Sequence, residues 1–307
     1  LNMADVAARL GDLTGNPALT VSVILMGVGL GLKMALFPLH VWLPDAYTHA
    51  SSTSTAIIAP IMTKVSAYVL IRMIYFVYGA DWSLAELGIG PVVSWLAMAG
   101  VVWGSVMALA QRDVKRMLAY SSVAQVGYIG LGLATGHPLA LAGAILHILN
   151  HAMMKSCLFL VTGSVELSGG PRDLDHWQGL GRRMPLTFVG FTLAALAMVG
   201  IPPTSGFFSK WYLALGLASS GHWALLVLLI LSGLLTAGYF FRVLERLYAR
   251  QPREDSVLPA GEATAAMNLP VIVLGAGTLL LGLFNAWFVG QVIARALPAG
   301  MNLPGVS

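Results

Sequence analysis

The sequence predicts an all-α membrane protein, and its composition and the length of its apolar runs carry that prediction. Of the 307 residues, 57% are hydrophobic and only 10% are charged, and the mean hydropathy is +0.80. A soluble domain has about 25% charged and about 45–50% apolar residues. The apolar residues here form runs of the length that a membrane-spanning helix needs, about 20 residues. These runs are too long and too uniformly apolar for the strands of a membrane β-barrel.

Eight apolar runs of this kind follow one another along the chain. They cover residues 19–37, 55–78, 89–109, 116–134, 138–162, 184–216, 222–248 and 268–289. We expect each run to cross the bilayer once, and the polar stretch 249–262 to form a surface loop. The sequence therefore predicts a single membrane domain of about eight transmembrane helices over residues 1–307.

Prolines interrupt the first and the sixth runs. Pro38 and Pro44 lie at the end of the first run, and Pro202 and Pro203 lie in the middle of the sixth. Proline removes a helical N–H group and clashes with the preceding turn. In lipid, the freed backbone groups need partners from neighbouring helices or water. We therefore expect two broken helices inside the bundle, where such helices commonly border a transport site.

The basic residues of the loops predict the orientation of the helices. With eight crossings, the loops after the first, third, fifth and seventh runs share one side, and they hold most of the loop Lys and Arg residues. The other side holds only Arg9 and Arg295. Because cytoplasmic loops are enriched in Lys and Arg, we expect the first side to face the cytoplasm and both termini to lie on the outer side. The membrane would be a cell inner membrane or plasma membrane.

Ionisable side chains inside the apolar runs form the candidate site. Besides Arg72, which lies late in its run and is expected to reach the interface, they are Lys33, Lys64, His147, His151, Lys155 and Lys210. An ionisable group at mid-bilayer costs about 3 kcal/mol or more and usually marks a transport pathway. Lys33, Lys64 and Lys210 also lie within two helical turns of a proline, where disrupted backbone can admit water.

His147, His151 and Lys155 are spaced at i, i+4 and i+8 on one predicted helix. This spacing places all three on one face, over roughly 12 Å of membrane depth. Because imidazole accepts and donates protons near neutral pH, the arrangement is typical of a proton relay. Polar contacts between helices are the alternative interpretation.

The composition also argues against other kinds of site. No Asp or Glu lies in the central part of a run, so the lysines need a carboxylate from another segment or subunit, or are often neutral. The single cysteine, Cys157, excludes a disulfide framework and a multi-cysteine metal or iron–sulfur site. The chain has no basic tract that would indicate a nucleic-acid partner. We expect no cofactor and no metal in this chain.

Four segments, in order, carry a resemblance to a known family. They are GLKMALFPLHVWLPDA at 31–46, the His147–His151–Lys155 helix, the loop 172–185 and GIPPTSGFFSK at 200–210. They resemble the antiporter-like subunits of complex I-type NADH:quinone oxidoreductases, Mrp cation/proton antiporters and membrane-bound hydrogenases, especially the Mrp D-like and the complex I chain-N-like members. That family has fourteen core helices in which two five-helix repeats are inverted. The resemblance implies that residues 1–80 end the first repeat, 89–249 form the second, and 268–307 hold the last helix and a tail.

The resemblance also implies roles for the candidate residues. Lys33 would belong to a first half-channel, beside a glutamate on a helix that this sequence does not contain, and we expect the chain to be part of something longer. Lys64 would lead to the centre, where His147, His151 and Lys155 form a hydrophilic axis. Lys210 would end the second half-channel.

We therefore expect a proton-translocating membrane subunit of a complex I-type NADH:quinone oxidoreductase or a related ion pump, which itself performs no redox chemistry. Its partners would be the lipid bilayer and other membrane subunits, one of which, or a missing segment, supplies the buried glutamate. An Mrp-type cation/proton antiporter or a membrane-bound hydrogenase is the alternative host. A structural scaffold that conducts nothing is a further alternative. A haem subunit is disfavoured, because His147 and His151 on one helix cannot be opposite ligands of one haem.

Overall fold

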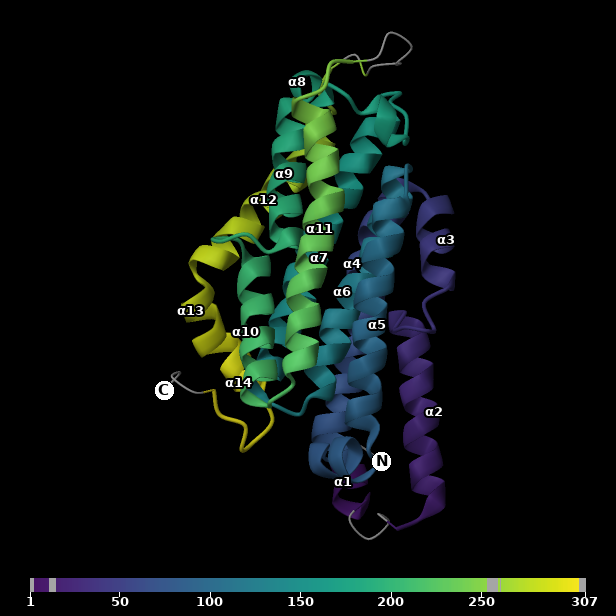
Figure 1. Ribbon diagram of the computed structural model, residues 1–307, viewed down its shortest axis with the longest axis vertical. Helices are drawn as coiled ribbons and strands as arrows, with labels where there is room; N and C mark the ends of the chain where they lie inside the picture. The colour runs from purple at the N-terminus through teal and green to yellow at the C-terminus, as the bar shows by residue number, and fades with distance from the viewer. Residues whose placement is uncertain (1–2, 11–14, 253–258, 260, 304–307) are drawn as a thin grey trace.

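The computed structural model describes residues 3–10, 15–252, 259 and 261–303, and it is helical throughout the bundle (Figure 1). Its α-helices are α1 (Met3–Leu10), α2 (Pro17–Met34), α3 (Trp42–His49), α4 (Ser52–Arg72), α5 (Ile89–Ala110), α6 (Val114–Ala134), α7 (Pro138–Leu167), α8 (Leu180–Arg183), α9 (Pro185–Val199), α10 (Ser205–Ser219), α11 (Trp223–Tyr248), α12 (Ala265–Leu283), α13 (Asn285–Phe288) and α14 (Ala294–Ala296). Three π-helical segments, η2 (Met73–Tyr78), η3 (Asp81–Glu86) and η5 (Val289–Ile293), and one 3₁₀ turn, η4 (Leu174–His176), complete the elements.

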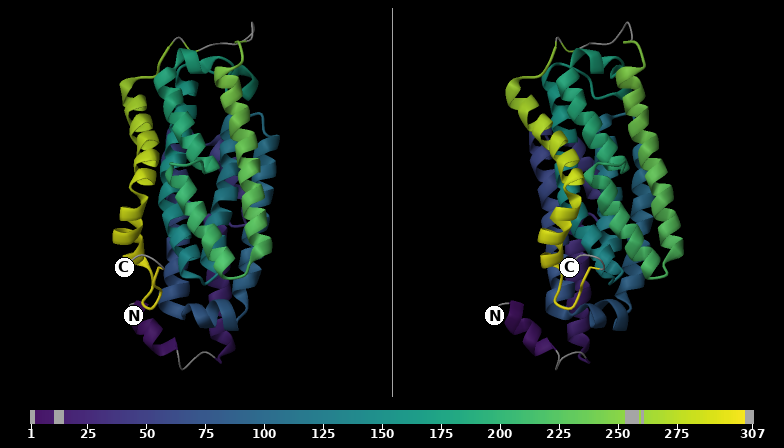
Figure 2. Two further views of the ribbon diagram at one scale, coloured as in Figure 1. Left: turned by 60° about the vertical axis from the view of Figure 1, so that its left-hand side comes forward. Right: turned by 90° about the vertical axis from the view of Figure 1, so that its left-hand side faces the viewer.

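The prediction of an all-α membrane protein is confirmed. Within the described residues, seven helices are long and apolar enough to cross a membrane: α2, α4 with η2, α5, α6, α7, α11 and α12. The remaining expected span, 184–216, consists of α9 and α10, which follow one another along the bundle with a short irregular segment between them (Figures 1 and 2). The first and last helices, α1 and α14, both lie in the lower half of Figure 1, and α8 lies at the top.

The first break lies between α2 and α3. Helix α2 ends at Met34, and Ala35 adopts a left-handed conformation with φ 62°. The Trp42 indole N–H donates to the Leu32 carbonyl at 2.9 Å, so one carbonyl freed at the end of α2 has a partner on the far side of the break. Pro38 lies inside this break, whereas Pro44 lies in the first turn of α3. The interruption therefore includes Pro38 but not Pro44, because proline is tolerated in the first turn of a helix.

The second break lies between α9 and α10 and contains Pro202 and Pro203. Gly200 ends α9 with φ 91°, a conformation that glycine adopts without steric cost. A Cβ at Gly206 would overlap the Ala197 carbonyl oxygen, so the start of α10 lies directly against the end of α9. The two glycines make the break tight enough for backbone groups of α9 and side chains of α10 to meet.

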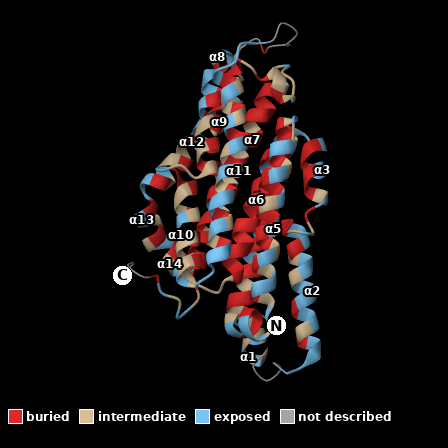
Figure 3. Cartoon of the chain, in the orientation of Figure 1, coloured by how far each residue is buried: buried red, intermediate tan, exposed pale blue. Residues whose placement is uncertain are grey.

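The core of the bundle consists of α6 and α7. Helix α6 is almost entirely buried, and α7 is buried along most of its length, whereas α2, α11 and α12 expose long apolar faces (Figure 3). Close approach of α5 and α6 depends on glycine, because a Cβ at Gly127 would lie 2.6 Å from the Ala97 carbonyl oxygen. The exposed apolar faces are those expected of helices that meet lipid or other membrane segments.

Candidate functional site: a lysine and histidine axis across the bundle

The central part of the candidate site is one face of α7. His147, His151 and Lys155 have exposed fractions of 2%, 0% and 0%. The two imidazole rings are stacked with 5.8 Å between their centroids. The i, i+4, i+8 spacing therefore produces the expected column of ionisable side chains, and this column is buried inside the bundle.

The Lys155 ammonium group is held by α6. Its Nζ donates to the Leu118 carbonyl at 2.6 Å and to the Ser121 hydroxyl. Among the described residues, no carboxylate lies within ion-pair distance of it. Hydrogen bonds to neutral oxygens compensate less for a buried charge than a carboxylate does, so the charged state of Lys155 is costly at this site.

Lys64 is held by its own helix, close to Pro60. Its Nζ donates to the Ala59 carbonyl at 2.8 Å and to the Thr63 hydroxyl at 3.0 Å, and the residue is only 5% exposed. Because Pro60 lacks an N–H group, the Ala56 carbonyl loses its helical donor. The Ser156 hydroxyl of α7 donates to that carbonyl at 3.3 Å. The proline thus joins α4 to the helix that carries the central column.

Lys210 lies at the second break. Its Nζ donates to the carbonyls of Met198 at 2.7 Å and Val199 at 3.1 Å, two of the last carbonyls of α9. These carbonyls have no partner within α9 and lie at the negative end of its dipole. The Tyr128 ring lies on another side of the ammonium group, with 5.0 Å from Nζ to the ring centroid. The break therefore provides the groups that stabilise a cation at Lys210.

His147 connects the column to the second break. Its Nδ1 lies 2.9 Å from the Ser209 hydroxyl of α10, and its Nε2 lies 3.0 Å from Gln125 Oε1 of α6. Nearby, Asn150 donates to the Ser205 carbonyl at 2.7 Å. His151 differs from His147, because both of its ring nitrogens are buried without a hydrogen-bond partner among the described residues.

The structure does not bring Lys33 into this group. Lys33 is exposed on α2, whereas Lys64, His147, His151 and Lys155 are buried and Lys210 is partly buried. Helix periodicity could not reveal this, because the run 19–37 is apolar on all sides and does not show which side meets the bundle. Sequence reasoning also missed Ser121, Gln125 and Tyr128, which lie on an apolar-looking helix, and only the packing of α6 against α7 identifies them.

Charged pairs lie at the helix ends and in loops rather than on the axis. In the described part of the chain they are Arg116–Asp45, Arg172–Glu166, Arg246–Asp175 and Arg250–Glu245. The described residues contain no group of three or more His, Cys, Asp or Glu side chains arranged to hold a metal ion. The chemistry that the axis supports is proton transfer between lysine, histidine, hydroxyl groups and water.

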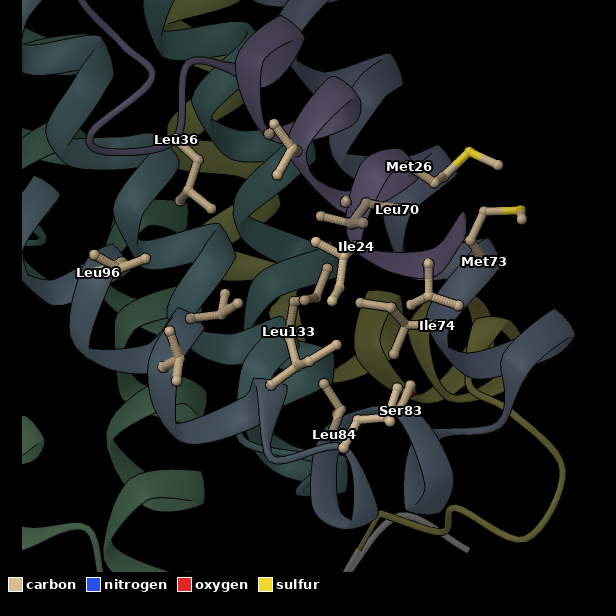
Figure 4. A pocket seen from close by; sticks show the side chains of 18 of the residues that line it. Ile24, Met26, Leu36, Leu70, Met73, Ile74, Ser83, Leu84, Leu96 and Leu133 are labelled. Carbon is tan, nitrogen blue, oxygen red and sulfur yellow. The ribbon is translucent and has the colours of Figure 1, made fainter. Parts of the chain in front are cut away.

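A cavity of ≈ 350 Å³ lies beside the first break and is separate from the axis (Figure 4). Aliphatic side chains of α2, the α4–η2 helix, η3, α5 and α6 line it, among them Ile24, Leu70, Ile74, Leu84 and Leu133. None of its lining residues is ionisable except Tyr78, so the cavity offers no charged group for transport.

The fold and the axis define a helical membrane protein of the transporter kind, with cationic side chains on two broken helices and between them. The chain belongs to the NADH:quinone oxidoreductase/Mrp antiporter transmembrane family, whose model matches residues 2–236. The resemblance found in the four sequence segments is therefore confirmed.

The similar proteins include subunits of dehydrogenases and a chain of an Mrp complex. The chain is 49% identical over 309 residues to NADH-quinone oxidoreductase subunit N of Desulforudis audaxviator, with 97% of this chain and 61% of that protein covered. It is 36% identical to F(420)H(2) dehydrogenase subunit N of Methanosarcina mazei, with 95% of this chain and 60% of that protein covered. A chain of the Mrp complex from Dietzia sp. DQ12-45-1b has the same fold, with TM-score 0.84, 25% identity and 94% and 60% covered. The chain thus spans about three fifths of the length of these relatives.

Proposed function

We propose that this chain is a proton-translocating membrane subunit of a redox-driven complex of the NADH:quinone oxidoreductase type. The observation that carries the proposal is the axis itself. Lys64 lies on α4, Lys155, His151 and His147 follow one another along α7, and Lys210 lies at the second break, which His147 contacts through Ser209. The 49% identity to a subunit N of NADH-quinone oxidoreductase supports this host over the others. The chain would carry protons, and the redox chemistry would take place in partner subunits.

The axis moves protons because, among the described residues, its buried ammonium groups are stabilised by neutral groups and not by carboxylates. A proton that arrives at Lys64 places a positive charge close to the α7 column, and two like charges repel strongly where the dielectric constant is low. The repulsion favours release of a proton from the column toward Lys210, where the free carbonyls of α9 accept the charge. Each protonation thus drives the next one without any carboxylate on the axis.

Lys33 would act with a neighbour. Its side chain lies on the exposed face of α2, so a second membrane subunit, or a further segment of the same protein, could approach it. We propose that this neighbour supplies a buried glutamate that pairs with Lys33, as the resemblance implies. The same proposal assigns residues 1–80 to the end of one repeat and 89–249 to a second, with both termini outside the cytoplasm of the cell.

An Mrp-type antiporter is the second candidate host, and the fold shared with an Mrp complex supports it. Sodium prefers carboxylate and carbonyl oxygens. The carbonyls at the second break are used by Lys210, so this chain would supply the proton path of an antiporter rather than its cation site.

The test is Lys155→Ala in the intact complex, in inside-out vesicles from cells that express it. We expect NADH-driven acidification of the vesicle lumen to stop, while native gels show an assembled complex. Lys115→Ala is the matched control, since Lys115 is also a fully buried lysine of the bundle but donates to the Ala50 carbonyl at a helix end, away from the axis. Normal acidification by an assembled Lys155→Ala complex would refute the proposal. Acidification changes that require a sodium pulse instead of NADH would favour the antiporter.

A further inference from the structure

A second line of polar groups runs beside the histidine column, between α6 and α11. It consists of hydroxyls whose residues are each no more than 1% exposed: Ser121 and Tyr128 on α6, and Ser232, Thr236 and Tyr239 on α11. The α11 residues have the spacing i, i+4, i+7, so they share one face of that helix. Such a row of hydroxyls inside a membrane bundle needs partners, because water is not freely available there.

The two ends of this row contact the lysines of the axis. At one end, the Ser121 hydroxyl accepts a hydrogen bond from Lys155 Nζ. At the other end, the Tyr128 hydroxyl lies 2.7 Å from the Ser232 hydroxyl, and the Tyr128 ring lies against both Lys210 and His147. The His147 ring is edge-on to it, with 5.6 Å between centroids.

Tyr239 lies between these two ends. Its hydroxyl faces the side chains of Thr236 and Ser121. It is 0% exposed, yet it has no well-aligned hydrogen-bond partner among the described residues. A buried polar group without a partner is rare in folded proteins and calls for an explanation. A hydroxyl that exchanges partners between Ser121 and Thr236 is such an explanation.

The histidine column alone is a limited route to Lys210. His147 Nε2 is bonded to the amide oxygen of Gln125, and an amide oxygen only accepts hydrogen bonds, so it has no proton of its own to release in exchange. Hydroxyls differ, because each can accept a proton on its oxygen while it releases its own. A route through hydroxyls therefore avoids the Gln125 amide.

We propose that Tyr239 completes a hydroxyl relay that connects Lys155 to Lys210 through Ser121, Thr236, Ser232 and Tyr128, in parallel with the histidines. The proposal rests on the proton-translocating function proposed above. In the structure, the hydroxyls of Ser121, Ser232 and Thr236 donate to backbone carbonyls of their own helices, so each must rotate to pass its proton on. One proton leaves the Lys155 ammonium, each hydroxyl takes up one proton and gives up one, and one proton reaches the Lys210 amine. No hydroxyl keeps a charge. The last step, from the Tyr128 hydroxyl to Lys210 Nζ, requires a bridging water molecule, because Nζ lies over the Tyr128 ring.

The test is Tyr239→Phe in the intact complex, with the same vesicle assay. If the two routes share the flux equally, NADH-driven acidification falls to about half, since the other route remains. The melting temperature of the complex does not fall, because the substitution keeps the ring and removes a hydroxyl that has no aligned partner. Tyr75→Phe is the matched control: that buried tyrosine donates to the Leu133 carbonyl at 2.7 Å, away from the axis, and its loss leaves acidification unchanged.

A second pair of variants keeps the test informative if Tyr239→Phe does not assemble. Thr236→Val removes the hydroxyl and preserves the shape, whereas Thr236→Ser preserves the hydroxyl. If the relay operates, the rate of NADH-driven acidification is reduced in Thr236→Val and normal in Thr236→Ser. Full acidification by both Tyr239→Phe and Thr236→Val overturns the relay, and if Lys155→Ala is inactive in the same vesicles, the proposed function still stands. Full acidification by Lys155→Ala overturns both.

Discussion

Gly282→Ala tests whether α12 supports the second break. Gly282 lies near the end of α12, and a Cβ there would overlap the Pro203 carbonyl oxygen and lie 2.7 Å from the Thr204 carbonyl carbon. Real Cβ atoms do not approach other atoms within 3.0 Å, so α12 or the break must move by roughly 1 Å. All of the close atoms belong to the backbone, which cannot change rotamer to make room.

The cost follows from two opposing effects. Overpacking of this kind costs typically 1–3 kcal/mol, and the rigid backbone places Gly282→Ala at about 3 kcal/mol. Replacing glycine by alanine inside a helix returns about 1 kcal/mol. We expect a net loss of about 2 kcal/mol, together with slower proton translocation, because the displaced segment positions the carbonyls that hold Lys210.

Gly233→Ala on α11 is the control for this prediction. A Cβ at Gly233 meets nothing within 4 Å, so that variant gains the helical preference of alanine without any clash. Thermal unfolding of the purified complex in detergent compares the two variants, and their melting temperatures should move in opposite directions. Equal stability of the two variants would refute the close contact between α12 and the break.

Two further predictions concern single hydrogen bonds. Gln125→Leu removes the acceptor of the buried His147 Nε2–H, so we expect a loss of about 1–3 kcal/mol in thermal stability; Gln111→Leu, at a less buried helix end, should cost less, and an equal loss would contradict the assignment. His137 caps the start of α7 by accepting from the Leu139 N–H at 3.3 Å, and burial lowers its pKa from the ordinary value of 6.5. The folded state binds the His137 proton less readily than the unfolded state does. The contribution of the neutral His137 cap to the free energy of unfolding is therefore complete above pH 6.5 and is lost as the pH falls below that value. His137→Asn keeps a capping oxygen and should remove that part of the pH dependence, as melting curves at several pH values would show.

The sequence predicts the spans and the α7 column well, because both follow from local rules. Long apolar runs identify helices in lipid whatever their neighbours are, and His147, His151 and Lys155 share a face for any α-helix. The breaks were predictable because proline acts on its own backbone. Helix α3 was not predictable from the sequence, because the stability of such a short helix depends on which neighbouring groups form hydrogen bonds with its terminal N–H and C=O groups.

The partners of the axis could not be predicted in the same way. Ser121, Gln125 and Tyr128 are ordinary residues on a helix that is buried on all sides, and only the packing of α6 against α7 and α10 makes them neighbours of the axis. Lys33 shows the opposite limit, because it lies within two helical turns of a proline as Lys64 and Lys210 do, yet its side of α2 is exposed in this chain. Which face of a uniformly apolar helix meets the bundle is decided by tertiary contacts.

The carbonyls that hold Lys210 belong to Met198 and Val199, and they would be present whatever side chains those positions carried. A scan that replaces one side chain at a time at Lys210, Met198 and Val199 would therefore identify the lysine but not the carbonyl oxygens that bind it. Changes that alter the course of the chain, such as those at Gly200, at the two prolines or at Gly282, are the ones that displace those oxygens. For this protein, the residues most informative about the charge at Lys210 are thus ones that have no charge and no polar side chain.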